Sequence, residues 1–434
     1  MALLLLSQAS CSAGPGEGEE GLPLDIGMLG SELSGSAPVV VSLTFDDTVA
    51  NQYTARDILK SHGMQGTFYL NSPRIGVAGY LSQQQVQDLV SDGNEIGSHT
   101  LSHPHLPALE ASEQRREMCN DRVALMNMFA PTNPGFSVNS IAYPYGEFSG
   151  VTQEAASACG FTSGRGTGGL CGTCSTAAAE AIPPASAMNV RSYGSVQSTT
   201  PVSTITGWIT NARANGGGWV PIIFHHICTN CGQYAMTAAN FDALLTWIQS
   251  NAAAMNIQVR TVNQVMGVPA KPLVFGPVAN DSLEKDVNPA DGLADCWQRG
   301  RFGTNTVAWS RTPDGHSGAS AETMTISSFT SGNRKLVTRQ DLGICAPPAR
   351  PGHSYSVSGW YKGSGQARMV AYYRDTGGVW RYWSNGPALA ASSTWAQATF
   401  TTPVAPSVAR GLSFGLSLES AGSLTMDDFA VVEN

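Results

Sequence analysis

The hydrophobic and polar positions of this chain follow two different periods, and the change between them lies near residue 270. Up to about Gly267, short apolar runs alternate with longer segments in which apolar residues recur every three or four positions. Beyond Pro272 the helical period is lost, and short segments alternate apolar and polar residues, with Gly and Ser between them. The pattern therefore predicts an α/β part followed by an all-β part.

The first part opens on a β-branched run, Val39–Phe45, which ends on two adjacent carboxylates, Asp46 and Asp47. Further strands are predicted at Gly66–Asn71, Glu95–Ser98, Ser140–Tyr143, Val190–Tyr193, Trp219–Phe224 and Ile257–Thr261. The helical segments between them are Asn51–Ser61, Ser82–Asp92, Glu110–Phe129, Ser149–Cys159, Thr204–Asn215 and Thr237–Asn251. This alternation is typical of βαβ units, so we expect a parallel sheet or barrel whose strand-end side chains meet at one rim.

The second part carries short alternating segments separated by turn residues, which predict a β-sandwich or jelly roll. Its strands are expected at Ser354–Trp360, Met369–Arg374, Ala396–Thr401, Leu412–Leu418 and Leu424–Val432. We therefore divide the chain into a leader and tether (1–36), an α/β domain (37–268), a Pro-rich linker (269–274) and a β-sandwich module (275–434). The short linker restricts the orientations of the two modules.

Composition and charge narrow the classes of partner. Only 13% of the 434 residues are charged, and the net charge of −8 argues against nucleic acid or an anionic membrane surface. A neutral polymer remains compatible with this charge. Beyond the leader, no apolar run is long enough to span a membrane.

The nine cysteines point to export. Removal of Cys11 with a leader leaves an even number, as expected for disulfides in an oxidising compartment. Cys296 and Cys345 are the only two in the last third, so we expect them to pair. Cys119 and Cys159 fall on two predicted helices and can pair as well.

The other four cysteines form two CxxC units, Cys171–Cys174 and Cys228–Cys231. Four thiolates can hold a structural zinc ion, whereas in an exported protein the same residues form loop disulfides. The sequence does not fix their connectivity.

The first residues resemble part of an export signal. Met1–Leu6 is apolar, and Ser7–Cys11 ends like a lipoprotein cleavage site. We therefore expect a secreted or cell-surface protein with a lipid anchor at Cys11, and a Gly-rich tether after it.

Two histidines form the second group of candidate functional residues. His99 and His103 are four residues apart, so on a tight loop or helix both can reach one ion. Two imidazoles and one carboxylate leave coordination positions open for water and substrate, as in hydrolytic zinc sites. One of the two adjacent acids, Asp46 and Asp47, can be a ligand while the other stays free as a base.

These residues lie in a series of motifs. Thr44–Asp47, His99–His103, Tyr143–Gly146 and Ile223–His225 follow one another as in the NodB-type polysaccharide deacetylases, which residues 37–267 resemble. The resemblance implies a distorted (β/α) barrel that uses one divalent metal, Zn²⁺ first and Co²⁺ or Ni²⁺ as alternatives, to remove acetyl groups from a carbohydrate.

Roles carry over from this resemblance position by position. Asp47, His99 and His103 are the implied metal ligands, and Asp46 is the implied general base. His225 is the implied general acid, and the backbone N–H of Tyr145 is implied to bind the oxyanion. His226 points the opposite way along a strand, so we assign it to packing or to the outer face.

The chain departs from the family pattern where the third motif normally carries an arginine that holds the catalytic Asp. Ala142 stands at that position, and the Asp-Trp motif that tunes the catalytic His is missing between residues 160 and 200. Arg191, at a predicted strand end, is our first candidate for the missing guanidinium, and Arg165 is the second.

The last part, 275–434, resembles the jelly-roll carbohydrate-binding modules. Six of the nine Trp residues lie there, and aromatic faces stack on sugar rings. Tyr372, Trp380 and Trp383 lie on a predicted hairpin and are our candidates for sugar binding. Glu284 and Asp427 are candidate ligands of a structural Ca²⁺.

The sequence thus predicts an exported deacetylase with a polysaccharide as its partner. An N-acetylated hexosamine polymer such as chitin, an exopolysaccharide or peptidoglycan glycan is the first substrate class. The alternatives are an O-acetyl esterase acting on a xylan-like polymer and a non-catalytic sugar-binding surface protein with a decayed barrel.

Overall fold

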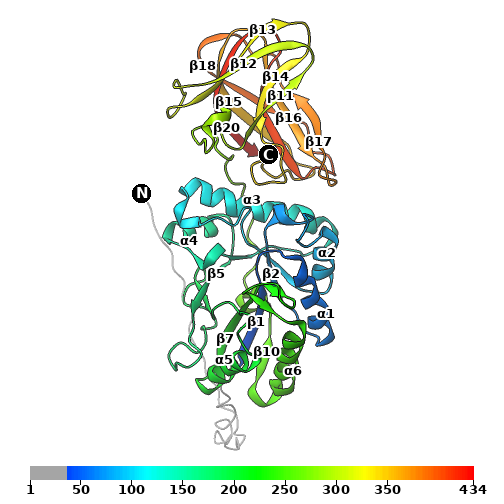
Figure 1. Cartoon of the computed structure of the whole chain (residues 1–434), viewed down its shortest axis with the longest axis vertical. Helices are drawn as coiled ribbons and strands as arrows, with labels where there is room; N and C mark the ends of the chain where they lie inside the picture. The colour runs from blue at the N-terminus through cyan, green and yellow to red at the C-terminus, as the bar shows by residue number, and fades with distance from the viewer. Residues whose placement is uncertain (1–36) are drawn as a thin grey trace, which may run out of the picture. The chain divides into compact units, whose positions relative to one another are not determined.

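The computed structural model describes residues 37–434, so the expected leader, tether and lipid attachment at Cys11 lie outside the described residues. Figure 1 shows a barrel of strands surrounded by helices, followed in the chain by a part built of strands. The predicted α/β and all-β classes are both confirmed. In the described range, no helix combines the length and the apolar character that a membrane span requires.

Eight parallel strands form the barrel sheet. They are β1 (Val39–Phe45), β2 (Thr67–Leu70), β3 (Glu95–Ser98), β4 (Ser140–Ala142), β5 (Ser163–Gly169), β6 (Val190–Ser192), β7 (Gly218–Phe224) and β10 (Ile257–Val259). β1 pairs with β7 along its whole length and also with β10 and β2. Tyr193 N donates to Pro221 O (3.2 Å) and Val196 N to Ile223 O (2.9 Å), so the chain beyond β6 joins β7 and the barrel nearly closes.

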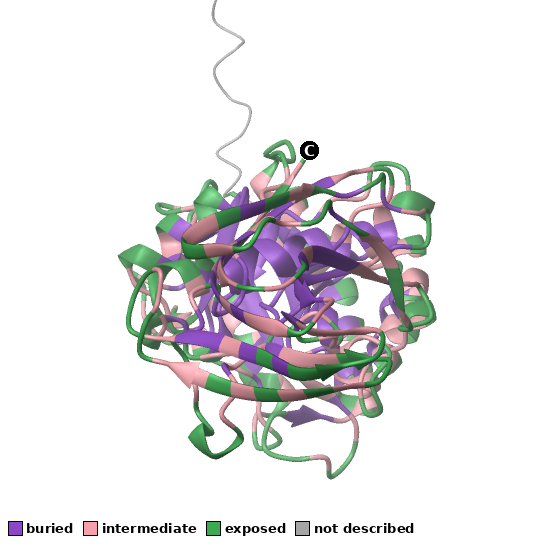
Figure 2. Cartoon of the chain, turned by 90° about the horizontal axis from the view of Figure 1, so that it is seen from above, coloured by how far each residue is buried: buried purple, intermediate pink, exposed green. Residues whose placement is uncertain are grey.

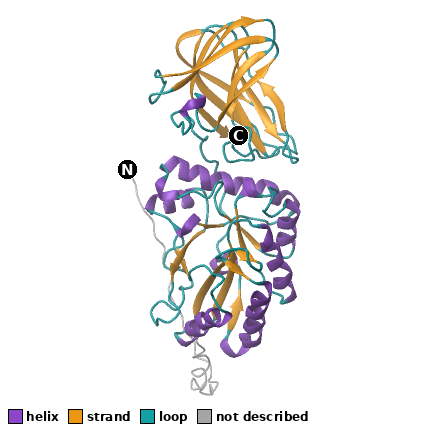
Figure 3. Cartoon of the chain, in the orientation of Figure 1, coloured by secondary structure: helices purple, strands orange, loops and turns teal. Residues whose placement is uncertain are grey.

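Helices cover the outside of the barrel (Figure 3). They are α1 (Tyr53–Ser61), α2 (Gln83–Ser91), α3 (Ala111–Phe129), α4 (Gly150–Ala158), α5 (Val202–Ala214), α6 (Ala238–Met255) and the short α7 (Val262–Met266). A small parallel pair, β8 (His226–Ile227) and β9 (Ala235–Met236), follows β7.

The alternation of side chains along β1 sets up the site. Val39, Val41 and Leu43 belong to the core cluster under the helices, whereas Val40 belongs to a separate cluster with Trp219 of β7. Successive residues of a strand point to opposite faces, so the even-numbered positions face the barrel interior. Asp46 continues this even series, which carries its carboxylate toward the interior.

Two five-stranded antiparallel sheets form the C-terminal sandwich. Their strands are β11 (Trp297–Phe302), β12 (Asn305–Thr312), β13 (Ala321–Phe329), β14 (Asn333–Thr338), β15 (Tyr355–Gly363), β16 (Ala367–Arg374), β17 (Trp380–Asn385), β18 (Ser392–Thr401), β19 (Gly411–Leu418) and β20 (Gly422–Glu433). The orders are β11-β14-β19-β16-β17 and β12-β13-β20-β15-β18. Figure 2 shows buried residues gathered inside and exposed ones on turns and outward faces.

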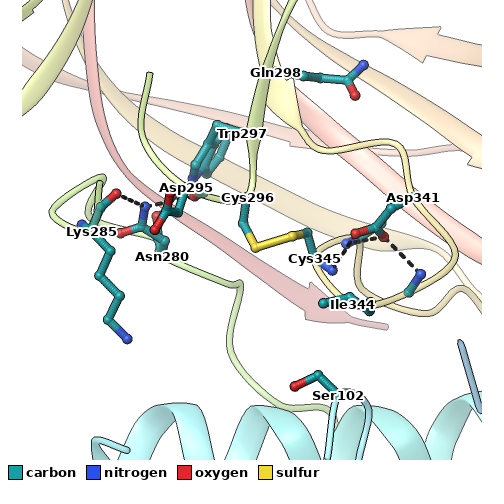
Figure 4. Close-up of a disulfide and its surroundings, with 12 residues drawn as sticks. Ser102, Asn280, Lys285, Asp295, Cys296, Trp297, Gln298, Asp341, Ile344 and Cys345 are labelled. Atoms are coloured by element: carbon teal, nitrogen blue, oxygen red, sulfur yellow. Dashed lines mark hydrogen bonds between the residues drawn. A yellow bond between two sulfur atoms is a disulfide. The ribbon is translucent and has the colours of Figure 1, made fainter. Parts of the chain in front are cut away.

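Four disulfides join the eight described cysteines. The expected pairs Cys119–Cys159 and Cys296–Cys345 are confirmed. Each CxxC unit pairs within itself, so the four-cysteine zinc alternative is not what this structure contains. Figure 4 shows Cys296, immediately before β11, bonded to Cys345. The Asp341 carboxylate organises the loop of Cys345 by accepting backbone N–H bonds, one of them from Cys345 itself (2.9 Å).

Helix α3 buries an unusually polar set of side chains: Gln114, Arg116, Glu117, Asn120, Asp121, Arg122 and Asn127. Arg122 donates to the carbonyl oxygens of Lys271 (2.7 Å) and Pro272 (2.8 Å) in the linker. Asn127 Nδ2 donates to Ala349 O (2.9 Å). These bonds fasten the linker and part of the sandwich to the helix.

Candidate active site

Polar side chains that follow β1, β3 and β7 meet at the carboxyl-terminal rim of the barrel. Asp46 and Asp47 follow β1, His99 follows β3, and His225 follows β7, while His103 lies in the loop beyond His99. The expectation that these strand ends converge is confirmed by the distances between the groups.

Asp47, His99 and His103 form a cluster in which one ligand atom from each lies within 4.8 Å of the others. Asp47 Oδ1 lies 3.2 Å from His103 Nε2 and 3.6 Å from His99 Nε2. Two imidazole nitrogens and one carboxylate oxygen this close together suit a divalent metal with hydrolytic function. The donor set therefore fits the metal that the sequence predicts.

Hydrogen bonds and backbone conformation hold these ligands in place. His99 Nδ1 donates to Ala142 O (2.8 Å), which leaves the lone pair of Nε2 free to face Asp47. Asn71 Nδ2 donates to the carbonyl oxygen of His99 (2.6 Å). Asp47 (φ 81°) and His103 (φ 61°) adopt left-handed backbone, a conformation that costs energy and is often found at functional sites.

Asp46 is buried and forms an ion pair with Arg165. Arg165 Nη2 lies 2.6 Å from both Oδ1 and Oδ2 of Asp46. Burial raises the pKa of Asp46, but the charges of Arg165, His99 and His225 outweigh that effect and hold it below its ordinary value. The carboxylate is therefore ionised and able to accept a proton.

The first candidate for the missing guanidinium, Arg191, is wrong. Its Nε donates to Glu180 Oε2 (2.9 Å) and its Nη2 to Glu180 Oε1 (3.0 Å). The second candidate, Arg165, holds Asp46 instead, because Arg165 on β5 pairs in register with Ala142 on β4. The guanidinium that the resemblance implies at the position of Ala142 thus comes from the neighbouring strand.

His225 lies near the other carboxylate oxygen of Asp47, with its Nε2 3.9 Å from Oδ2, whereas the two ligand histidines lie near Oδ1. Gln52 Nε2 donates to His225 O (2.9 Å) and also to the carbonyl oxygen of Asp46. Burial lowers the pKa of His225, against the opposing effect of the two aspartates. The Tyr234 ring packs 5.1 Å from the imidazole.

Tyr145 lies at the mouth of the site. Its backbone is left-handed (φ 59°), and its side chain is 56% exposed. The ring stacks on His105 at 4.0 Å and meets His103 edge-on at 4.6 Å. The oxyanion role of its backbone N–H stays a prediction.

The aromatic candidates on the sandwich occupy different environments. Tyr372 lines a cleft of about 470 Å³, whereas Trp383 packs against the sandwich core and Trp380 lies against Arg374. Tyr382 (57% exposed) and Phe302 (68% exposed) line the same cleft and were not anticipated. The position of Tyr382 follows from strand parity, since its side chain points to the opposite face from that of Trp383.

The two calcium candidates contact one loop. Glu284 Oε1 accepts from Ala319 N (2.9 Å), and Asp427 Oδ2 accepts from His316 N (2.7 Å). Burial raises the pKa of Asp427 to about 6. The Ca²⁺ site stays a prediction.

Sequence reasoning missed the groups that position the ligands. Asn71 and Gln52 make buried hydrogen bonds to the backbone carbonyls of His99 and Asp46. Asn71 ends the predicted strand Gly66–Asn71, so its place at a strand end was the one available signal. Gln52 lies at the start of a helical segment, where the sequence gives no sign of its contacts.

Comparison with known proteins identifies the first module. Residues 35–164 match the family model described as Polysaccharide deacetylase. A chitin deacetylase from Pestalotiopsis sp is 36% identical over 114 residues, which are 25% of this chain and 38% of that protein. A peptidoglycan-N-acetylglucosamine deacetylase from Bacillus cereus is 32% identical over 109 residues, which are 25% of this chain and 36% of that protein.

One similar solved structure is the Xyl-CE4 domain of a multidomain xylanase from the hindgut metagenome of Trinervitermes trinervoides. Its sequence identity to this chain is 19% and its TM-score is 0.37. The match covers 55% of this chain and 95% of that chain. The chain spans less than half the length of each of the two curated relatives. Residues 35–164 therefore belong to a polysaccharide deacetylase domain, and an antiparallel β region lies in the C-terminal part of the chain.

Proposed function

We propose that this protein is an extracellular, metal-dependent hydrolase that removes acetyl groups from a polysaccharide, with N-acetylated hexosamine polymers as the first substrate class. One observation carries the proposal: the Asp46 carboxylate, ionised by Arg165, lies beside the Asp47, His99 and His103 cluster. Since Arg165 fills the gap left by Ala142, the main argument for a decayed barrel loses its support. Relatives named for chitin and peptidoglycan support the substrate class.

The chain's own residues divide the proton transfers. Asp47, His99 and His103 would hold a divalent cation, which would polarise the acetyl carbonyl and acidify the attacking water. Asp46 accepts the proton of that water, and the buried Arg165 keeps it ionised for this purpose. His225 donates a proton to the leaving amine or hydroxyl.

In this proposal the backbone N–H of Tyr145 donates a hydrogen bond to the oxyanion as it develops. A donor fixed at that place stabilises the transition state more than the ground state. The left-handed backbone at Tyr145 supports a dedicated role, because such strain is kept where the surroundings require it. The exposed ring of Tyr145 at the mouth offers an apolar face to a sugar ring.

Acetate release tests the activity directly. The purified protein should release acetate from at least one polymer in a panel of chitin oligomers, peptidoglycan glycan, an N-acetylated exopolysaccharide and acetylated xylan. Chelation should abolish the release, and Zn²⁺ or Co²⁺ should restore it. Release from acetylated xylan alone would replace the N-acetyl substrate by an O-acetyl one.

Two variants separate metal binding from catalysis. His103→Ala should lose both metal and activity, whereas Asp46→Asn should keep the metal in elemental analysis and lose activity. Full activity of a metal-free preparation on every productive substrate would contradict the proposal.

We further propose that the sandwich binds a glycan in the cleft of about 470 Å³ that Tyr372, Tyr382 and Phe302 line. Exposed aromatic rings beside hydrogen-bonding groups such as Asn333 and Asn385 are what a sugar ring requires, since its faces stack and its hydroxyls bond. Lys335 Nζ donates to the Tyr372 hydroxyl (2.7 Å) and fixes that ring. A tethered second site raises the local concentration of polymer near the barrel.

A further inference from the structure

A second cluster of metal-ligating side chains lies immediately after the proposed general acid. His226, Cys228 and Cys231 each offer one ligand atom, and these atoms lie within 4.8 Å of one another. None of the three takes part in the proposed deacetylation. Their residue types, one imidazole and two sulfurs, are those of zinc sites rather than of calcium or magnesium sites.

The loop that carries the cluster is fixed at both ends. His226 N donates to Tyr234 O (3.1 Å) and Cys228 N donates to Met236 O (2.9 Å), which closes the loop between β8 and β9. The three side chains are half-buried, and the loop lines a cavity of about 290 Å³. A small solute in this cavity therefore reaches Cys228, whose backbone position is already set.

The side chain of Asn51 gives an independent sign of a ligand. Its Nδ2 lies 3.0 Å from both His226 Nδ1 and Cys228 Sγ, so the lone pairs of these two atoms converge on one electropositive group. The other end of the same amide, Oδ1, is buried without a hydrogen-bond partner, which costs free energy. Rotation of the amide exchanges the two atoms and brings Oδ1 to the same place as a fourth donor.

We propose that, once the Cys228–Cys231 disulfide is reduced, His226, Cys228 and Cys231 bind a thiophilic divalent cation such as Zn²⁺, with Asn51 Oδ1 as the fourth donor. A dithiol reductant supplies two electrons and two protons to the disulfide and itself becomes a disulfide. Cation binding then releases both thiol protons to solvent. The disulfide and the cation site exclude each other, because both use the same two sulfurs.

This site shares two short segments with the active site. The Tyr234 ring, at the end of the same loop, packs 5.1 Å from the His225 ring. Gln52, the neighbour of Asn51, donates to the carbonyl oxygens of His225 and Asp46. Exchange of the disulfide for the cation therefore acts next to the proposed acid and base. This last consequence rests on the proposed function, whereas cation binding does not.

Cobalt titration tests the binding, because Co²⁺ replaces Zn²⁺ and its thiolate complexes have a sulfur-to-metal charge-transfer band. The Cys171→Ser/Cys174→Ser variant keeps only one CxxC unit and is the starting protein. After chelation, the dithiothreitol-reduced form should bind one Co²⁺ per chain more than the oxidised form and show the band. Thiol counting confirms reduction, and near-ultraviolet circular dichroism confirms the fold.

Two further variants decide the assignment. Cys228→Ser/Cys231→Ser should lose the extra cation and the band in the reduced state, while the other reducible cysteines remain. His226→Gln should keep the thiols and weaken the extra site at least tenfold. A reduced protein that binds no extra cation, or a band that persists in Cys228→Ser/Cys231→Ser, would overturn the proposal. Acetate release enters none of these measurements, so failure of the deacetylase proposal leaves the outcome readable.

Discussion

Arg165 Nη2 lies 2.6 Å from both carboxylate oxygens of Asp46, although 119 positions separate the two residues in the chain. The pair exists because Arg165 is the register partner of Ala142 on the neighbouring strand. Both side chains are buried, so the ion pair is shielded from solvent and salt. The ionisation state of the proposed base thus depends on a residue that strand pairing brings in.

We predict that Arg165→Met lowers kcat for acetate release about 100-fold while the metal content stays normal, because general base catalysis contributes factors of about that size. Elemental analysis beside steady-state kinetics checks both parts. Arg191→Met is the matched control, since Arg191 pairs with Glu180 instead. An equal loss in the two variants would mean that Arg165 acts on folding and not on Asp46.

The pH profile gives a second readout of the same pair. Arg165 is among the charges that hold the pKa of Asp46 below its ordinary value, so its removal should raise that pKa. A base works only above its pKa, and the acidic limb of kcat/KM should therefore move to higher pH in Arg165→Met. The limb should not move in Arg191→Met.

Asp121 should make stability depend on pH. Burial raises its pKa to about 7, while Ser98 Oγ and Ser72 N donate to its carboxylate. The folded protein therefore binds this proton more tightly than the unfolded chain. The resulting stability is fully present below pH ~4, the unfolded pKa, and is lost as pH rises through about 7.

Asp121→Asn should remove this decline, because an amide keeps the donor and acceptor pattern of the protonated acid. Urea unfolding at pH 5 and pH 8 should show a difference for the wild type, on the order of a few kcal/mol, that is much smaller in Asp121→Asn. The exposed Asp57→Asn variant is the control and should behave as the wild type. A wild-type stability that rises from pH 5 to pH 8 while that of Asp121→Asn does not would contradict the assignment.

Tyr382→Ala and Phe302→Ala should each weaken glycan binding by the sandwich about tenfold, since an aromatic contact contributes about 1 kcal/mol beyond burial. Calorimetry on the same polymer panel measures this, and the melting temperature should stay unchanged because both rings are mostly exposed. Trp383→Ala should instead lower the melting temperature, because that ring packs on the core. Unaltered affinity in both cleft variants would remove the cleft from the binding site.

Arg122→Met should destabilise the whole described region. The guanidinium donates to four main-chain oxygens, those of Val138, Cys159, Lys271 and Pro272. Buried carbonyls that lose their donors cost about 1–3 kcal/mol each, so a loss of about 3 kcal/mol or more is expected in urea unfolding. The exposed neighbour Arg115→Met should change stability little, and equal effects of the two variants would argue against the assignment.

Much of the fold and of the candidate metal site could be predicted because short stretches of sequence contain the signals for both. The β-branched run before Asp46 and Asp47 defines a buried strand by itself, and the spacing of His99 and His103 defines a chelate. β5 was missed because Ser163–Gly169 is rich in glycine and poor in apolar residues. Arg165 was consequently only the second candidate for the guanidinium that holds Asp46, because its contact with Asp46 depends on strand pairing in the barrel, which local sequence patterns do not encode.

The hairpin of β16 and β17 is a second example of a feature that local sequence patterns do not determine. The aromatic residues of Trp380–Trp383 are obvious in the sequence, but which of them faces the cleft depends on the pairing of β17 with β16. That ladder shifts register between Ala371 and Tyr372. A shift of one residue turns every side chain to the other face, so the choice between Tyr382 and Trp383 requires the three-dimensional register.

The polar helix α3 also bears on how such chains are assembled from parts in evolution or in the laboratory. Multidomain enzymes are usually treated as independent modules that can be separated at the linker and exchanged. Here a cut after residue 272 would remove the acceptors of Arg116 and Asn127, which are Ile344 O and Ala349 O, and would expose this side of α3 to water. Transfer of the sandwich to another protein would therefore require α3 to be transferred with it, or a helix whose exposed face suits water. The unit that is inherited together is thus larger than either module.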